Sequence, residues 1–447
     1  MKDYQVIYVP AGVPTFHLES AGRLFESSVD LLRSICPETK CPEEMLLSPD
    51  AVSAFLDDKD PDLIIFQDIT FAHGAYMQEV VRRFRDVPVL LWTLREPVID
   101  GGRLRLNSLT GAFSAANTMR QFCEKGFEYI YGGPDEEKVI RKIRAAVAAA
   151  RVRHDLKDMK LAQIGHTPQG FGFGRALDND MLLNFGVRVE SIEARELIDR
   201  ARTYTDEECA DYLEKANQAM KGLENTPERN RLDFARLYKA YDEYIRENGI
   251  GLLSSRCWPD FFTSFGTPVC AVLGMLNDMG VSSSCEADSY GALSMHIGRM
   301  LTGRPAFFGD PVSLDEKENT VYFWHCGTAA CSLARKDTGA KVGVHCNRKI
   351  GPTLEFGCEA ADRVTIFRIG REPDGSFRSF IASGEALDMP QQFLGTSLVV
   401  RTDSNAEDII YRSVKAGWEP HFAVIYGDVA EELEILSGMY GMAVERY

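Results

Sequence analysis

The sequence predicts an α/β protein whose last third is rich in β-strands. In the first third, short apolar runs alternate with amphipathic stretches, a pattern typical of parallel strands joined by crossover helices. A fresh strand at Lys160 leads into a glycine-rich turn, where a second α/β unit is expected. After about residue 330, alternating strands such as 363–369 are followed by turn sequences such as Pro373-Asp374-Gly375.

The expected elements divide the chain into three domains. A charged helix from Asp135 to about Leu156 ends the first unit, so we place the first boundary near residue 157. A chain of 447 residues also exceeds what one hydrophobic core usually supports. We expect two α/β domains and then a β-rich C-terminal domain, with the ranges 1–157, 158–330 and 331–447. The expected strands of the first sheet are residues 5–9, 63–66, 87–92 and 129–131.

Two features of the second domain have competing interpretations. The turn at 166–174 carries three glycines and would suit a backbone cradle for a substrate. Because Gly-x-Gly-x-Gly is not the dinucleotide fingerprint, a tight structural turn is the favoured interpretation. Residues 205–249 are strongly helical, and their aromatic stripe fits a core better than a cofactor site. The helix signals are a capping box of Thr205 and Glu208 and a stripe of Phe234, Tyr238, Tyr241 and Ile245.

The composition excludes several classes of partner. The formal net charge of −16 repels nucleic acid backbones and anionic lipid heads, so small molecules and proteins are expected instead. The first residues read as a strand rather than a signal peptide, and no run of about 18 apolar residues occurs, so we expect a cytoplasmic protein with no membrane partner. Eleven cysteines lie scattered without a C-x-x-C pair, which argues against a disulfide framework and a zinc knuckle.

Two acids, Glu286 and Asp310, are the strongest candidates for chemistry. Each ends a segment that reads as a buried strand, where a carboxylate is costly to bury unless a cation compensates. The interval of 24 residues (310 minus 286) suits one strand–helix–strand step. We therefore expect both acids at one edge of a sheet with a divalent ion between them. For each acid alone, a helix cap or a surface turn is the competing interpretation.

Two histidines extend this candidate site. His325 follows the aromatic run 321–324, and His421 lies between Pro420 and the apolar strand 422–426. Either histidine, taken alone, is equally consistent with a hydrogen-bonded core residue. Together with the two carboxylates they supply the oxygen and nitrogen ligands that suit manganese, magnesium or zinc. We therefore predict a divalent metal site that is used for chemistry.

These segments, in their order along the chain, resemble the L-fucose and L-arabinose isomerases and their relatives. The similarity covers nearly the whole chain, and its motifs are short but keep the order and spacing of the family. It rests on Cys257-Trp258-Pro259, Cys285-Glu286-Ala287-Asp288-Ser289-Tyr290-Gly291-Ala292-Leu293, Asp310, Trp324-His325-Cys326-Gly327 and the segment 417–427, with support from Leu91-Trp92, Arg103-Leu104-Arg105-Leu106-Asn107-Ser108 and Tyr131-Gly132-Gly133-Pro134.

The resemblance implies a subunit with two Rossmann-like α/β domains followed by a β-rich C-terminal domain. It implies a manganese ion, or another divalent cation such as Mg2+ or Co2+, held by Glu286, Asp310 and His421. His325 looks like an additional residue beside the metal or the substrate. Members of this family interconvert an aldose and its ketose by moving a proton between C1 and C2 of the open-chain sugar through an enediol. They assemble as trimers and hexamers, so a homo-oligomer is expected.

Glu286 and Asp310 are also the catalytic candidates. A divalent ion that bridges O1 and O2 of the sugar acidifies the neighbouring C–H and stabilises the enediolate charge. The two carboxylates, on opposite sides of the sugar, would then take and return the proton. The alternative has both acids acting only as ligands while a water molecule at the metal carries the protons.

Further candidates for substrate binding are Trp258, Asp260, Trp92, Arg103 and Asn107. Asp260 stands where many relatives have Cys-Trp-Pro-Glu, so its carboxylate is one methylene shorter. Because sites in this family lie near subunit contacts, Trp92 and the loop from Arg103 to Asn107 are expected to reach a neighbouring subunit. The competing interpretation is that Trp92 is a buried strand residue.

The substrate and the activity both have alternatives. We predict a deoxyhexose, a pentose or a modified hexose; for an anionic substituent the candidates are Arg95, Arg103 and Arg105, although exposed loop charges are the favoured interpretation. A sugar-binding or regulatory protein without turnover is the main alternative, disfavoured by the intact metal-site residues. An NAD-linked dehydrogenase lacks the nucleotide fingerprint. A metal-assisted hydrolase or lyase needs a water-activating open ligand position.

Overall fold

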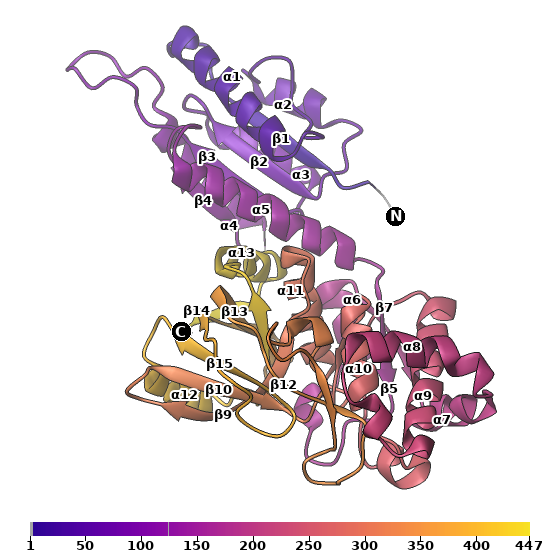
Figure 1. Cartoon of the computed structure of the whole chain (residues 1–447). Coiled ribbons are helices and arrows are strands. Elements are labelled where there is room, and N and C mark those ends of the chain that lie inside the picture. Colours follow the sequence, from indigo (N-terminus) through magenta and orange to yellow (C-terminus); the bar gives the residue numbers. More distant parts are fainter. Residues whose placement is uncertain (1–2, 124) are drawn as a thin grey trace. The chain divides into compact units, whose positions relative to one another are not determined.

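The computed structural model describes residues 3–123 and 125–447 (Figure 1). Within it the chain divides into two compact units. Unit 1 comprises the residues up to Asp155 together with Glu431–Ala443, and unit 2 comprises Leu156–Ala430 with Val444–Tyr447. No helix within the described ranges combines the length and the apolar character needed to cross a lipid bilayer.

Unit 1 contains a four-stranded parallel sheet with strand order β1-β2-β3-β4. The first three strands are buried along their whole length, which explains their continuous apolar runs. All four strands match the predicted ones, with small shifts at their ends. The strands are β1 (Val6–Ala11), β2 (Leu63–Asp68), β3 (Val89–Thr93) and β4 (Glu128–Tyr131). The helices are α1 (Leu18–Ile35), α2 (Pro49–Leu56), α3 (Gly74–Arg83), α4 (Ser108–Phe122), α5 (Glu137–Leu156) and α13 (Ala430–Tyr440).

The hydrophobic core of unit 1 joins the sheet to helices α3 and α4. Val9, Phe66 and Leu91, from three neighbouring strands, belong to one buried cluster. Tyr76 of α3 and Met119 of α4 complete this cluster. The crossover helices therefore cover the sheet, as the alternation of apolar runs and amphipathic stretches predicts.

Unit 2 begins with a second parallel sheet, whose strand order is β6-β5-β7-β8. Helix α9 packs its aromatic stripe into the core, because Phe234, Tyr238 and Tyr241 are all buried. The strands are β5 (Lys160–Ile164), β6 (Arg188–Ile192), β7 (Ile250–Ser255) and β8 (Ser282–Ser284). The helices are α6 (Asp178–Phe185), α7 (Ala194–Thr203), α8 (Ala210–Ala219), α9 (Glu228–Asn248), α10 (Cys270–Asp278) and α11 (Ser289–Thr302), with short turns η1 (Gly172–Gly174), η2 (Glu207–Cys209), η3 (Leu223–Asn225), η4 (Phe261–Phe265) and η5 (Cys331–Leu333).

The predicted capping box is present at the start of η2. The backbone N–H of Thr205 donates to Glu208 Oε2 over 2.8 Å, and the Glu208 N–H donates back to Thr205 Oγ1 over 3.4 Å. These bonds satisfy two backbone donors at the beginning of the helical segment. They open a short turn rather than the long helix α9, which begins only at Glu228.

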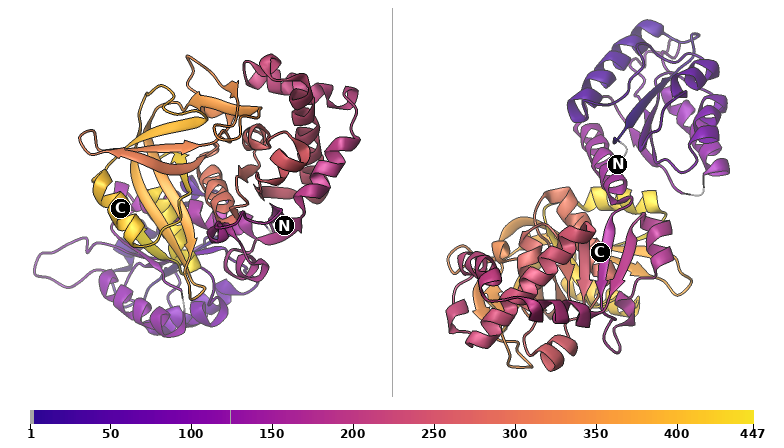
Figure 2. Two further views of the ribbon diagram at one scale, coloured as in Figure 1. Left: turned by 90° about the horizontal axis from the view of Figure 1, so that it is seen from below. Right: turned by 90° about the vertical axis from the view of Figure 1, so that its right-hand side faces the viewer.

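The rest of unit 2 is a mostly antiparallel β-structure, coloured orange to yellow in Figure 2. Its strand order is β11-β12-β15-β10-β9-β16-β13-β14-β17, and β14 also pairs with β15. Six strands from β15 to β14 therefore close into a barrel, in agreement with the β-rich last third that the sequence predicts. The strands are β9 (Phe307–Asp315), β10 (Thr320–His325), β11 (Lys341–Gly343), β12 (Thr353–Gly357), β13 (Ala361–Arg371), β14 (Phe377–Ala386), β15 (Thr396–Thr402), β16 (Phe422–Tyr426) and β17 (Ala443–Arg446), with helix α12 (Ala406–Lys415) between β15 and β16.

The structure corrects the predicted relation between the strands that carry the two acids. Glu286 follows β8 of the parallel sheet, whereas Asp310 lies within β9 of the barrel. Strand β9 pairs with β10 on one side and with β16 on the other, antiparallel in both cases. The short turn between β9 and β10 makes a hairpin, and this local pairing takes β9 out of the parallel sheet. The two acids therefore belong to different sheets of unit 2.

Candidate functional site

Three side chains from distant parts of the sequence converge in unit 2. His421 Nε2 lies 2.9 Å from Glu286 Oε2 and 3.4 Å from Asp310 Oδ1. His421 directly precedes β16, whose Phe422 pairs with Gly309 of β9, so the barrel register places His421 beside Asp310. Glu286 reaches them from the turn after β8. The structure thus brings together the three residues that the resemblance implies as metal ligands.

His325 occupies a fourth side of this group. It ends β10, and its Nε2 lies 3.9 Å from Glu286 Oε2. Its ring centre is 5.8 Å from that of His421. The neighbouring residue Trp324 pairs with Asp310 across the hairpin, so the pairing of β9 with β10 places Asp310 and His325 close to each other.

The group lies in an aromatic surrounding. The ring of Phe308 is 4.8 Å from the His421 ring, and the ring of Phe173 is 5.4 Å from it. The ring centre of Phe171 lies 6.3 Å from the ring centre of His421. Phe171 and Phe173 belong to the glycine-rich turn, so this turn supplies aromatic rings to the site in addition to the backbone cradle that its glycines suggest. Apolar walls strengthen the electrostatic interactions inside the site.

A fully buried ion pair of Asp288 and Arg368 lies next to the Nδ1 side of the His421 ring. Asp288 Oδ2 accepts a hydrogen bond from His421 Nδ1 over 2.9 Å, and Arg368 Nη1 donates to the same oxygen over 2.5 Å. Arg368 Nη2 binds the other oxygen over 3.1 Å. This arrangement places the Nδ1 proton toward Asp288 and leaves Nε2 free to face Glu286 and Asp310. Neither Asp288 nor Arg368 was assigned a role from the sequence, although an arginine inside the apolar run of β13 was a signal.

The two acids differ in their affinity for protons. Burial raises the pKa of Asp310, and the charges of His421 and His325 oppose this increase without cancelling it. Burial also raises the pKa of Glu286, but the hydrogen bond with His421 and the charge of His325 bring it below its ordinary value. One acid is therefore pushed toward the protonated form and the other toward the ionised form.

Both histidines are strong bases in this surrounding. Burial lowers the pKa of His421, but its hydrogen bonds to Asp288 and Glu286 raise it to about 10. Burial likewise lowers the pKa of His325, while Cys326 and the two site carboxylates raise it to about 9. A cation at this site would compete with these protons for the same lone pairs.

The residues present fit a hard divalent cation. Asp310 Oδ1 is buried and has no hydrogen-bond partner among the described residues. Glu286 holds a left-handed backbone, with φ of 58°, which costs energy for a residue with a side chain. Ligand atoms of Glu286, His325 and His421 lie within 4.8 Å of one another. Two carboxylates and an imidazole are a suitable donor set for manganese or a similar ion.

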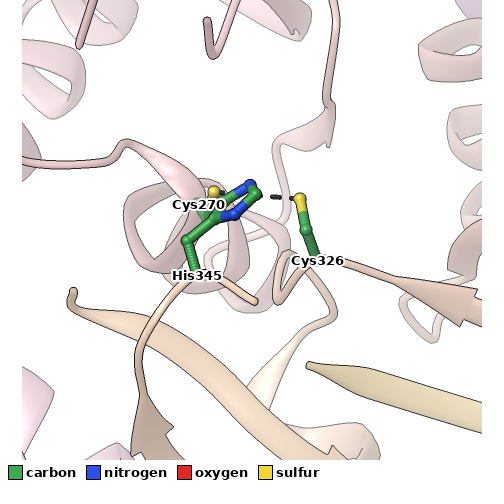
Figure 3. Close-up of side chains that lie close together, drawn as sticks. All are labelled: Cys270, Cys326 and His345. Atoms are coloured by element: carbon green, nitrogen blue, oxygen red, sulfur yellow. Dashed lines mark hydrogen bonds between the residues drawn. The ribbon is translucent and has the colours of Figure 1, made fainter. Parts of the chain in front are cut away.

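A second group of donors consists of Cys270, Cys326 and His345 (Figure 3). Cys270 Sγ and Cys326 Sγ are 4.0 Å apart, and His345 lies beside both. Cys326 Sγ is also 3.4 Å from His325 Nδ1. Hydrogen bonds with Cys270 and Cys285 lower the pKa of Cys326 well below its ordinary value. The Cys326 thiol and the Thr328 hydroxyl, which is 3.3 Å away, contact Nδ1 of His325, and Nε2 of this ring faces Glu286.

Two of the predicted substrate-binding residues lie beside this site. Trp258 Nε1 donates a hydrogen bond to Glu286 Oε1 over 3.3 Å. Asp260 Oδ2 forms an ion pair with Arg256 Nε over 2.9 Å. Trp258 thus contacts the candidate metal ligand itself, whereas the charge of Asp260 is matched by an arginine.

The other three predicted substrate-binding residues belong to unit 1. Trp92 is fully buried and donates its indole N–H to the Gly132 carbonyl over 2.8 Å, which is the competing interpretation given above. Arg103 donates to the carbonyl of Thr15 over 2.7 Å. Asn107 precedes helix α4 and accepts a hydrogen bond from Thr110 Oγ1 over 2.7 Å. In this structure the indole of Trp92 therefore presents no surface to a ligand.

Comparison with known proteins places the chain in a family. No protein-family model matches it. The sulfoquinovose isomerase of Clostridium sp. (strain MSTE9) is 62% identical over 447 residues, which is 100% of both chains. The sulfoquinovose isomerase of Priestia megaterium (strain ATCC 12872 / QMB1551) is 37% identical over 451 residues, again 100% of both chains, and that of Alkalicoccus urumqiensis is 36% identical over 442 residues, 98% of both. The chain therefore belongs to the family of these sulfoquinovose isomerases.

Proposed function

We propose that this protein is an aldose–ketose isomerase that interconverts sulfoquinovose, a glucose with a sulfonate at C6, and its 2-ketose. The convergence of Glu286, Asp310 and His421 carries this proposal, because these residues supply carboxylates and an imidazole at one buried point. The full-length similarity to sulfoquinovose isomerases supports the choice of sugar. A binding protein without turnover would have no use for this arrangement.

The same proposal includes a divalent cation, manganese in the first place, with Mg2+ or Co2+ as alternatives. Glu286, Asp310 and His421 would hold it, and His325 would lie beside it or beside the substrate. When bound, the cation polarises the sugar carbonyl and stabilises the negative charge that develops on the enediolate. Asp288 and Arg368 keep His421 in the required tautomer and orientation.

The opposed pKa shifts of the two acids suggest their roles in proton transfer. Glu286, held in the ionised form, removes the proton from C2 of the aldose, while Asp310, held toward the protonated form, gives a proton to O1. The product is the enediol. The proton on Glu286 exchanges with solvent water. Glu286 then gives a proton to C1, and Asp310 takes the O2 proton, so the ketose forms and both acids recover their first state.

Three expectations from the sequence remain part of this proposal; the first two come from the resemblance to L-fucose and L-arabinose isomerases and the third from the first residues and the lack of a long apolar run. They are the Rossmann-like character of the two parallel-sheet regions, assembly into a trimer or hexamer, and location in the cytoplasm. Light scattering of the purified protein measures the oligomer directly. A monomer at micromolar concentration would contradict the expected assembly.

The decisive experiment follows ketose formation from sulfoquinovose in deuterated water. The protein is dialysed against a chelator, and manganese is then added back. We expect activity only with the cation, together with deuterium at C1 of the ketose and at C2 of the remaining aldose. Tight binding of sulfoquinovose without isotope exchange would instead identify a binding protein.

The variant Glu286→Gln separates the role of a base from that of a ligand. We expect turnover to fall by about 10²- to 10⁴-fold, since the amide cannot accept the C2 proton. If turnover falls while manganese occupancy stays full, Glu286 takes part in proton transfer. If manganese is lost together with turnover, Glu286 acts only as a metal ligand. Glu214→Gln, which changes an exposed glutamate on α8, is the matched control.

A further inference from the structure

Arg348 is a cation near the site whose charge is not matched by an acid. It is half-buried, in the loop 344–352 between β11 and β12. No ion pair between described residues includes it, and no described group accepts a hydrogen bond from its guanidinium. Two other arginines close to the site are already paired, Arg256 with Asp260 and Arg368 with Asp288.

Two aromatic rings hold the Arg348 guanidinium in place. It lies 5.1 Å from the centre of the Trp258 ring and 4.9 Å from that of Phe262. Such stacking orients a guanidinium and leaves its N–H groups available at the edge for another partner. The side chain is therefore ordered before any anion arrives, which reduces the entropy lost on binding.

The loop that carries Arg348 is fixed by His345. The His345 ring is buried, 5.0 Å from the Phe262 ring, and its Nδ1 accepts hydrogen bonds from the backbone N–H groups of Asn347 and Arg348 over 3.3 and 3.4 Å. The backbone of His345 also bonds to Ile350 and Lys349 over 3.0 and 2.8 Å. The position of Arg348 is thus determined by hydrogen bonds within the loop and by the contact of His345 with Phe262.

Trp258 connects this arginine to the candidate metal ligands. The indole Nε1–H of Trp258 donates a hydrogen bond to Glu286 Oε1 over 3.3 Å, while the guanidinium of Arg348 lies 5.1 Å from the centre of the same ring. A single aromatic side chain therefore separates the guanidinium from the carboxylate. An extended open-chain hexose has its C6 substituent six bonds from C1, roughly 7 Å by the reach of an extended chain. A sugar whose C1 and C2 lie at Glu286 can place that substituent beside Arg348.

We propose that Arg348 binds the sulfonate group of the sugar and so determines substrate specificity. This inference rests on the proposed function. A sulfonate carries one negative charge on three oxygens, and the planar fork of a guanidinium can donate two parallel hydrogen bonds to two of them. Trp258 acts as the spacer between the reacting end of the sugar and its anionic end.

The test compares sulfoquinovose with 6-deoxyglucose, which has the same carbon chain without the sulfonate. The KM of sulfoquinovose is measured directly, and 6-deoxyglucose is measured as a competitive inhibitor of that reaction. In Arg348→Gln we expect the KM of sulfoquinovose to rise by about 10- to 100-fold, the usual effect of losing a charge-assisted hydrogen bond. The inhibition constant of 6-deoxyglucose should stay within about twofold, because this sugar has no group for the arginine to bind.

Two further variants complete the design. Arg348→Lys keeps the charge but loses the planar fork, so its KM should lie between those of the wild type and Arg348→Gln. Arg195→Gln removes an equal charge from an exposed position on α7 and should leave KM unchanged. An unchanged KM in Arg348→Gln, or equal losses for both sugars, would overturn the inference. A wild-type protein that does not isomerise sulfoquinovose would overturn the proposed function and this inference with it.

Discussion

At the scale of single residues, the buried pair of Asp288 and Arg368 organises the site. Both side chains are fully buried, and their charges interact with each other, with His421 and, for Arg368, with Glu419. Removing one partner from such a pair leaves an uncompensated charge in a medium that solvates it poorly. The pair therefore couples the stability of unit 2 to the orientation of the candidate metal ligand.

This coupling predicts a large cost for Asp288→Asn. The substitution keeps the shape of the side chain but removes the counter-charge that is hydrogen-bonded to the Arg368 guanidinium. We expect the free energy of unfolding to fall by about 3–5 kcal/mol, measured by urea denaturation of the metal-free protein. Asp337→Asn, at an exposed ion pair with Arg335, should change it by about 0–1 kcal/mol. Similar effects for the two variants would contradict the assigned role of the buried pair.

His296 predicts a specific dependence of stability on pH. Burial lowers its pKa to about 4, and the nearby charge of Arg299 acts in the same direction. Between pH 6.5 and 4 the unfolded chain binds a proton that the folded chain does not, so stability falls as pH decreases through this window. Because the folded pKa is depressed, this loss is complete below about pH 4.

The measurement compares unfolding of the wild type and His296→Asn at several pH values. We expect the difference between their free energies of unfolding to change by about 3 kcal/mol in favour of the variant between pH 7 and 4. His166→Asn, at a histidine whose side chain is 58% exposed, should show no such change. A pH-independent difference for His296→Asn would show that the imidazole is not held neutral.

At the scale of elements, the site depends on how helix α11 packs against the barrel. Gly298 lies on this helix, and a Cβ built there would meet Ile425 of β16 at 2.4 Å. The absence of a side chain thus allows α11 to approach the strand that follows His421. Asp288 caps the same helix by accepting a hydrogen bond from the Gly291 N–H over 2.9 Å, so the helix start and the site share one residue.

Substituting alanine at this helix position should be destabilising despite the higher helix propensity of alanine. We expect Gly298→Ala to lower the free energy of unfolding by about 1–3 kcal/mol, because the added methyl group overpacks the contact with Ile425. The control is Gly22→Ala in helix α1, where nothing lies within 4 Å of the added Cβ. That variant should gain up to about 1 kcal/mol. Equal signs for the two changes in denaturation experiments would contradict the close packing.

At the scale of the whole molecule, the candidate site lies entirely in unit 2, where two sheets of different kinds supply its residues. Glu286 comes from the parallel sheet, and Asp310, His325 and His421 come from the barrel. A cation held by both parts would bind only when unit 2 is folded. Metal binding is therefore expected to stabilise unit 2 by mass action.

This linkage predicts a manganese-dependent melting temperature. At a free concentration of 100 times Kd, the ion should add about 2.7 kcal/mol to the free energy of unfolding. Calorimetry with and without chelator measures this gain, and Asp310→Asn should abolish most of it. Asp337→Asn, which lies outside the site, should retain the whole gain. A wild-type melting temperature that does not change when manganese is added would argue against the metal centre.

The sequence by itself determined the types of elements and the identities of the chemical groups. The parallel strands of unit 1, the buried stripe of α9 and the β-rich last third all follow from local periodicity, which is a property of neighbouring residues. Glu286, Asp310, His325 and His421 were identifiable because polar residues beside buried strands are costly without a partner.

Only the tertiary structure decided which strands pair and which charges meet. The hairpin of β9 and β10 moved Asp310 into the barrel, since strand pairing depends on hydrogen bonds between segments that sequence spacing does not reveal. Asp288, which bonds to His421, and Arg368, which bonds to Asp288, are 133 and 53 residues away from His421 along the chain (421 minus 288, and 421 minus 368). Electrostatic matching acts through space in a low-dielectric interior, so such partners become visible only when the fold brings them together.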